Sequence, residues 1–292
     1  MNDKFSLSHK SEEPENGVLY VVGTPIGNLG DISFRALNIF KNVSLIACED
    51  TRQTRKIMTK FEFRNNLISF NKHNSNKKIP QIISNLNLGK SIAVVSDAGM
   101  PSICDPGEDL IREARSNSIN VICVPGPCAA LTALVSSGLP SSKFIFEGFL
   151  PKKNSEREKI LLEISTNEKT TILFESPHRL KTLLNNLKEI CGGDREILVS
   201  RELTKKYEEN IGNTIDEVIN YFATREVIGE ITLVIKGIKK VKENNYFNKA
   251  ELKKDLYDLI NAGLNLSKAS KYLAKKNNLK KSIIYNIYDK TN

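Results

Sequence analysis

VLYVVGTPIGNLG, the stretch from Val18 to Gly30, joins a short apolar run to a loop of small residues and decides the fold class of this chain. The same arrangement occurs twice more, where Ile92–Val95 precedes SDAGMPSICDPG and Val121–Val124 precedes PGPCAALTALVSSG. Short β-branched runs of this kind are typical of buried parallel strands. Ligands of open α/β sheets bind beyond the carboxyl ends of the strands, where glycine lets them approach the backbone. The three loops therefore predict an α/β fold with one binding cleft.

The glycine spacing of the first loop narrows the class of ligand. Gly23, Gly27 and Gly30 form GxxxGxxG rather than the GxGxxG of dinucleotide sites, and the chain contains no GxxxxGK[ST] phosphate loop. A dinucleotide or ATP site is therefore disfavoured. Glu49 and Asp50 follow an apolar run about twenty residues beyond the first loop, where a dinucleotide fold has a ribose-binding acid. A dehydrogenase thus stays open as a minor alternative.

Apolar runs and helical stretches alternate along the first half of the chain, which predicts a mostly parallel sheet. A second set of strands follows the Pro125–Pro140 segment, so we place the border between two α/β lobes there. The expected domains are a disordered segment 1–16, an N-terminal lobe 17–125, a second lobe 126–238 and a basic helical module 239–292. We expect strands at 18–22, 43–48, 92–95, 121–124, 143–147, 170–175, 196–201 and 230–236, and helices at 31–40, 52–60, 79–88, 108–116, 129–137, 249–262, 267–275 and 280–289.

The composition is that of an ordinary globular protein, with 40% apolar residues in 292. No run approaches the roughly 18 apolar residues of a membrane-spanning helix, and the N-terminal segment is polar, so we expect a soluble, cytoplasmic protein. The five cysteines form no CxxC pair and the chain has three histidines, so neither a metal site nor a disulfide framework is indicated.

The positive charge is concentrated at the C-terminal end. Of the net charge of +9, residues 239–292 carry +8, from 13 lysines against 5 acidic residues. Such a module predicts a polyanion partner, and its short helices, broken at Gly263 and capped at Ser267, resemble a helix-turn-helix. A solvated helical cap is the alternative. The lysines that we expect to bind RNA are Lys253, Lys254, Lys268, Lys271, Lys275, Lys276, Lys280 and Lys281.

Seven ordered motifs between Gly17 and Gly237 resemble those of the tetrapyrrole methylase superfamily: GTPIGNLGD, CEDTRQT, SDAGMPSICDPG, VPGPCAALTALVSSGLP, FEGFLP, FESPHR and GEITLVIKG. Within it, the chain is most similar to the branch that acts on small-subunit ribosomal RNA. The resemblance implies two α/β lobes with S-adenosylmethionine in a cleft between them, usually in a homodimer. It also implies 2'-O-methylation of a cytidine ribose in the decoding region of 16S ribosomal RNA, with free RNA and the assembled small subunit both open as substrates.

The resemblance also implies which residues hold the cofactor. Asp97 ends a predicted strand and can accept hydrogen bonds from a ribose or an amino group, while Ile103 offers an apolar contact for adenine. We interpret Asp105 as a cap of the helix that starts near Glu108, with Pro106 in its first turn. The implied cofactor residues are Pro25, Asp97, Ala98, Gly99, Ile103, Ala129, Ala130, Ile231 and Thr232.

A ribose hydroxyl is a weak acid, so methyl transfer to it needs a base or an electrostatic stabiliser. We favour Glu175 and Arg179 of FESPHR, although Ser176 and Pro177 give this motif an independent reason to exist, as a helix start. The other candidates are Glu49, Asp50, Arg52, His178, Arg201 and Glu202.

Two other functions fit parts of the sequence. A methyltransferase of the same fold that acts on a tetrapyrrole or a protein side chain would explain the loops, but a small tetrapyrrole gains nothing from the basic module. A nucleic-acid-binding regulator would explain the module but leaves the cleft loops unaccounted for.

Overall fold

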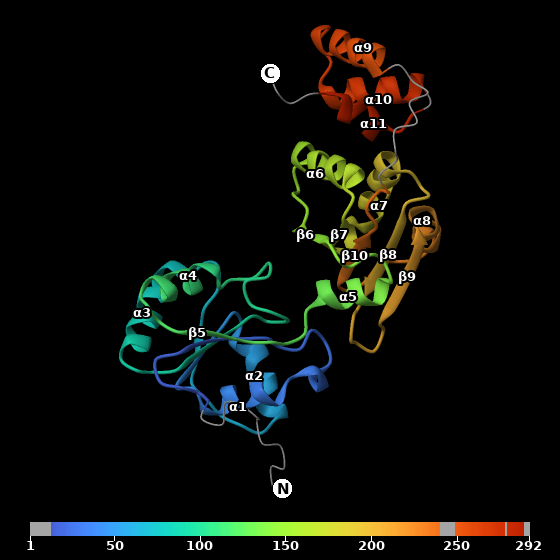
Figure 1. Cartoon of the computed structure of the whole chain (residues 1–292). Helices are drawn as coiled ribbons and strands as arrows, with labels where there is room; N and C mark the ends of the chain where they lie inside the picture. The colour runs from blue at the N-terminus through green and yellow to red at the C-terminus, as the bar shows by residue number, and fades with distance from the viewer. Residues whose placement is uncertain (1–12, 240–248, 278, 289–292) are drawn as a thin grey trace. The chain divides into compact units, whose positions relative to one another are not determined.

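The computed structural model describes residues 13–239, 249–277 and 279–288. The chain divides into two compact units, the first ending at Ala129 and the second beginning at Ala130 (Figure 1). This division lies a few residues beyond the predicted border at 125. Most of the segment expected to be disordered, 1–16, and the predicted linker after Lys239 lie outside the described residues, so the predicted domain limits stay predictions.

The first unit contains one parallel sheet of five strands in the order β3-β2-β4-β1-β5. Side chains of β1 alternate between two hydrophobic clusters: Tyr20 packs with α1 and α2, and Leu19 packs with α3 and α4. Helices therefore cover both faces of the sheet, as the apolar runs predict. The elements are β1 (Leu19–Val22), η1 (Leu29–Asp31), α1 (Phe34–Asn42), β2 (Leu45–Cys48), α2 (Thr51–Lys60), β3 (Leu67–Ser69), α3 (Ser75–Asn87), β4 (Ile92–Val95), α4 (Glu108–Ser116) and β5 (Val121–Val124).

The second unit contains a mixed sheet in the order β6-β7-β10-β8-β9. Only β6 and β7 are parallel, and the other neighbours are antiparallel. Its main hydrophobic cluster joins the sheet to α6, α7 and α8, for example through Leu161, Leu184 and Val218. The elements are α5 (Ala129–Ser137), β6 (Phe144–Phe149), α6 (Asn154–Thr166), β7 (Thr170–Glu175), α7 (Pro177–Cys191), β8 (Glu196–Arg201), β9 (Glu209–Thr214), α8 (Ile215–Ala223) and β10 (Ile231–Ile235).

Three C-terminal helices, α9 (Lys249–Asn261), α10 (Leu266–Lys276) and α11 (Lys281–Ile287), form a small hydrophobic core of their own around Leu256, Leu273 and Ile284. The predicted break at Gly263 is confirmed, with a left-handed φ of 96°. The predicted N-cap is wrong, because the Asn265 side chain caps α10 by accepting from the Lys268 N–H. Ser267 instead bonds to Glu158 of α6.

Candidate functional site

The three loops that the sequence singled out meet at the carboxyl edge of the first sheet. The Thr24 N–H donates to the Gly99 carbonyl at 2.9 Å, and the Gly99 N–H donates back to the Thr24 carbonyl at 3.1 Å. A Cβ atom placed on Gly23 would lie 2.6 Å from the Gly126 Cα, so the first and third loops touch through bare backbone. The three loops thus touch one another within the first unit, and their use as one binding site stays a prediction.

Gly99 is required by both its conformation and its surroundings. Its φ is +79°, and a side chain there would also crowd Ile26, whose Cγ2 lies 3.3 Å from the ideal Cβ position. The predicted cofactor residues around it differ in exposure, since Pro25 is buried while Ala98 and Ile103 are exposed. The loop thus combines a buried glycine with the exposed apolar side chain of Ile103.

Carboxylates from two neighbouring strands lie at this same edge. The Asp97 carboxylate accepts from the Asp50 N–H at 2.9 Å, and the Asp97 N–H donates to Glu49 at 3.4 Å. These contacts follow from the pairing of β2 with β4, which places Cys48 beside Val95. Removal from water raises the pKa of both the Glu49 and the Asp97 carboxyl groups.

Asp50 caps α2 and forms an ion pair with Arg52, with 2.6 Å between Oδ2 and Nη2. Hydrogen bonds from the Arg52 side chain and backbone lower the pKa of Asp50 to about 2. A carboxylate with this pKa is a weak proton acceptor near neutral pH. The geometry therefore gives Asp50 and Arg52 a structural use and argues against Asp50 as the base.

Asp105 is half-buried beside Ser96, and burial followed by the charge of Glu49 raises its pKa to about 6. The expected helix cap is wrong, because Gly107 is the N-cap of α4 and Pro106 precedes it. The turn before it is strained, with left-handed φ values of 70° at Ser102 and 67° at Cys104.

Lys72, which sequence reasoning missed, donates from Nζ to the Cys104 carbonyl at 2.9 Å. Its positive charge also offsets part of the rise that burial causes in the pKa of Glu49 and of Asp105. Lys72 belongs to none of the recognised motifs, and only the fold brings it to this loop.

In the second unit, several other predicted residues form one row across three strands. Ile231 pairs with Glu175 of β7 and with Arg201 of β8, and Thr232 occupies the next position. Residues separated by up to 56 positions in the sequence thus share one edge of the second sheet. Their assignment to the cofactor or to catalysis stays a prediction.

Glu175 and Arg179 form an ion pair at the start of α7, with 3.4 Å between Oε1 and Nε. Glu175 is 2% exposed, and its Oε1 also accepts from the Ser176 N–H at 2.7 Å. Within the part of the chain that the structure describes, Oε2 is buried without a hydrogen-bond partner. Arg179 donates from Nη2 to the Leu150 carbonyl at 3.0 Å, so the pair ties together β7, α7 and the end of β6.

The remaining catalytic candidates are placed differently. His178 is exposed on the first turn of α7. Glu202 accepts from the Glu230 N–H at 2.9 Å and from Lys205 at 2.8 Å. Burial alone would raise the pKa of Glu202, but these bonds outweigh it and lower the pKa. Glu202 therefore serves to hold two loops together.

Several of the predicted RNA-binding lysines are paired with carboxylates. Lys281 is 8% exposed and lies 3.0 Å from Glu158 of α6. Lys254, Lys268 and Lys275 are exposed, and Lys253 lies beside the Tyr257 ring. The other pairs are Lys271 with Glu189, Lys276 with Asp255 and Lys280 with Asp194.

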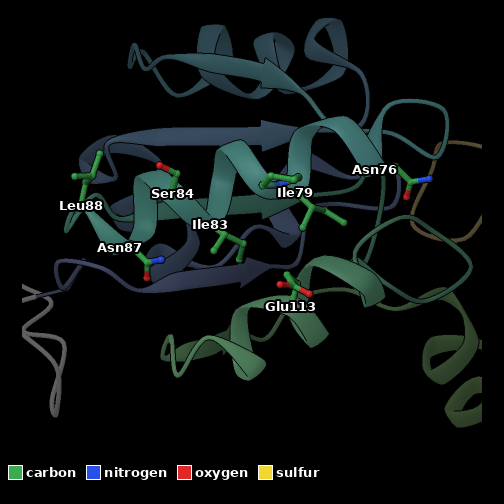
Figure 2. Close-up of a pocket in the computed structure, with 8 residues that line it drawn as sticks. Asn76, Ile79, Ile83, Ser84, Asn87, Leu88 and Glu113 are labelled. Carbon is green, nitrogen blue, oxygen red and sulfur yellow. The ribbon is translucent and has the colours of Figure 1, made fainter.

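A groove of about 840 Å³ runs along α3, lined by Ile79, Ile83, Leu88 and Glu113 among others (Figure 2). It lies along helix faces rather than at the loops, and it lacks their convergent carboxylates. Among the described residues there is no group of three or more histidine, cysteine or acidic side chains that could hold a metal ion. None of the helices described is long and apolar enough to cross a membrane.

Comparisons with known proteins agree on one family. Residues 18–219 match the family of tetrapyrrole (corrin/porphyrin) methylases. A Bacillus subtilis protein named "Ribosomal RNA small subunit methyltransferase I" is 42% identical over 288 residues, covering 98% of this chain and 97% of that protein. A Thermotoga maritima protein of the same name is 45% identical over 221 residues, covering 76% of this chain and 99% of that protein.

A solved structure supports the fold. It is the uroporphyrin-III C-methyl transferase of Thermus thermophilus complexed with S-adenyl homocysteine, with a TM-score of 0.53 and 14% identity. The match covers 75% of this chain and 96% of that structure, and at this identity it shows the fold alone.

Proposed function

The chain belongs to the tetrapyrrole methylase family, and from this premise we propose that it transfers a methyl group from S-adenosylmethionine to small-subunit ribosomal RNA. The observation that carries the proposal is the convergence of the loops after β1, β4 and β5 at one sheet edge. Relatives with this activity in their names cover 98% and 76% of the chain, which supports the proposed substrate class.

The cofactor suits the residues at the loop edge. S-adenosylmethionine supplies a methyl group already activated by a cationic sulfonium. Asp97, Glu49 and Asp105 offer negative charge for the cations of such a ligand, and Ile103 offers an apolar surface for its adenine. The left-handed φ of Gly99 shapes the loop that carries Asp97 and Ile103. The chain's role is thus to bind and orient rather than to activate.

The finer proposal is that the acceptor is the 2'-hydroxyl of a cytidine in the decoding region, in free RNA or in the assembled subunit. It draws on the motif resemblance and on the basic C-terminal helices. Glu175 and Arg179 are the proposed contributors to the transfer step, with Glu175 positioning the more exposed Arg179. We also propose that the protein is a cytoplasmic homodimer. Measurement of its molar mass in solution by light scattering tests the homodimer.

The experiment is a transfer assay with labelled S-adenosylmethionine and three separate acceptors: small ribosomal subunits, bare small-subunit RNA, and uroporphyrinogen III. The proposal predicts label in one of the two RNA samples, and no label with Asp97→Ala at limiting cofactor. Label in the tetrapyrrole alone would contradict it and favour the second function of the same fold.

A further inference from the structure

A polar cavity of about 360 Å³ lies where the C-terminal helices pack on α6 and α7. It is lined by four cationic side chains and two carboxylates, which gives it a formal charge of +2. These six residues are Arg157, Lys268, Lys271, Lys281, Glu158 and Glu189.

Both carboxylates are already neutralised within the wall of this cavity. Glu158 accepts from Lys281 at 3.0 Å and from the Ser267 hydroxyl, and Glu189 accepts from Lys271. Burial alone would raise the pKa of Glu158, but the bonds from Ser267 and Lys281 outweigh it and lower the pKa. These groups hold α10 and α11 onto α6 and α7 and leave no negative charge for the other two cations.

Arg157 and Lys268 therefore supply the excess charge. Arg157 donates from Nη2 to the neutral Asn154 side chain at 2.9 Å, and Lys268 is exposed. Neither has a carboxylate partner among the residues that the structure describes. A guanidinium and an ammonium on the wall of one polar cavity are best satisfied together by an anion.

The placement of these two cations adds to the effect. Arg157 lies in the first turn of α6, and Lys268 lies in the first turn of α10. The partial positive charge of a first helical turn adds to that of the two side chains, while the Lys268 and Arg157 N–H groups themselves donate to Asn265 and to the Lys153 carbonyl.

We propose that this cavity binds a phosphodiester group of the RNA substrate through Arg157 and Lys268. The inference rests on the proposed function, and it deepens it by adding α6 of the second unit to an RNA surface that the sequence placed only in 239–292. The planar guanidinium of Arg157 suits two phosphate oxygens at once, and Lys268 acts as a point charge.

The test uses the full-length protein and compares the double variant Arg157→Ala/Lys268→Ala with the control Lys159→Ala. Lys159 is an exposed cation of the same helix that does not line the cavity. Small-subunit RNA binding is titrated against salt. The double variant is expected to bind about tenfold more weakly, with the logarithmic salt slope reduced by about 0.7 for one lost phosphate contact. The control is expected to lose less than twofold.

Three further measurements separate the possible failures. Melting temperatures establish that the variants fold. Arg157→Lys/Lys268→Ala is expected to recover part of the affinity lost in the double variant, because it restores the charge at position 157. Wild-type affinity and slope in the double variant would overturn the proposal, even where wild-type protein methylates RNA. If the double variant loses the binding of inorganic phosphate but binds RNA as the wild type does, the cavity is a site for a free anion, and this result would also overturn the proposal. Wild-type protein that binds RNA at this cavity but transfers no methyl group to it would contradict the proposed function alone.

Discussion

At the scale of single residues, the surroundings of each aspartate at the carboxyl edge of the first sheet determine its pKa. Asp50 and Asp105 share this edge, yet the pKa of Asp50 is about 2 because Arg52 bonds to it, and the pKa of Asp105 is about 6 because it is buried near Glu49. The sequence identified the motifs that carry both residues, but it assigned Asp105 to a helix cap. Motif spacing contains no information on burial, which depends on how three loops pack.

Asp105→Asn should therefore stabilise the protein near neutral pH. The folded-state pKa of about 6 lies above the ordinary value of 3.8, so the folded state holds this proton more tightly. Its contribution is fully present below about pH 4 and is lost as pH rises through about 6. We expect the variant to gain about 1–2 kcal/mol at pH 7.5, allowing for partial exposure, and nothing at pH 4. Denaturant melts at both pH values measure this, and an equal difference at the two would contradict it.

Asp97→Ala should weaken cofactor binding in a protein that still folds. Loss of a hydrogen bond to a charged ligand costs about 1.5–3 kcal/mol, or roughly tenfold to over a hundredfold in affinity. Because Asp97 also accepts from the Asp50 N–H, Asp97→Asn is the matched variant that keeps this acceptor without the charge. Calorimetry with S-adenosylmethionine decides, and an unchanged dissociation constant in folded Asp97→Ala would remove Asp97 from the site.

Glu175→Gln and Arg179→Ala should each slow methyl transfer by roughly tenfold to a hundredfold, with a smaller effect on cofactor affinity. The expected cause is loss of the geometry that the ion pair imposes on the end of β6 and the start of α7. Single-turnover rates measured below the melting temperature test this, with the exposed Lys181→Ala as the control on the same helix. Wild-type rates at saturating substrate would leave the motif with a structural role only.

At the scale of elements, long apolar runs were predictable and polar or very short elements were not. The strands β4, β5, β7 and β8 begin and end at the predicted residues, because each contains an apolar run, which in β4 is fully buried. The strand β9 was missed since its sequence, ENIGNT, carries no such pattern, and β3 has only three residues. The helix α6 was not predicted, although it supplies the residues that hold the C-terminal helices.

The pairing of Lys281 with Glu158 shows the same limit, because a lysine that charge counting assigned to RNA is buried in an ion pair. Lys281→Met should loosen α10 and α11 by about 1–3 kcal/mol, less than for a fully enclosed pair since the Glu158 side chain is 43% exposed. Hydrogen exchange in α10 and α11 is the readout, and Lys275→Met, an exposed lysine of α10, is the control. Equal exchange in the two variants would show that the pair does not hold the helices.

At the scale of the whole molecule, charge and motifs are separated along the chain. The loops that converge in the first unit and the row of residues on the second sheet all precede Lys239, whereas the C-terminal helices carry most of the net charge and have their own core. The motifs predicted the fold of both units, since they are long and ordered. They could not predict which lysines are paired, because that depends on helices packing across the surface of the second unit.

Ending the chain after Lys239 should give a folded protein that binds S-adenosylmethionine normally and RNA weakly. This end retains the hydrogen bond from the Ile238 N–H to the Asn167 carbonyl, 2.8 Å long. Each lost phosphate contact should flatten the logarithmic salt slope of RNA binding by about 0.7. Salt titrations of both forms measure the change, and equal affinities with equal slopes would make the C-terminal helices a structural cap.

The central claim, methyl transfer to a cytidine ribose of small-subunit RNA, is tested most directly by the identity of the labelled nucleoside. Small subunits and bare RNA from cells lacking the enzyme are incubated with labelled S-adenosylmethionine, digested to nucleosides and analysed by mass spectrometry. We expect labelled 2'-O-methylcytidine, which is lost with Asp97→Ala at limiting cofactor. A base-methylated nucleoside, or no labelled nucleoside in either RNA sample, would contradict it.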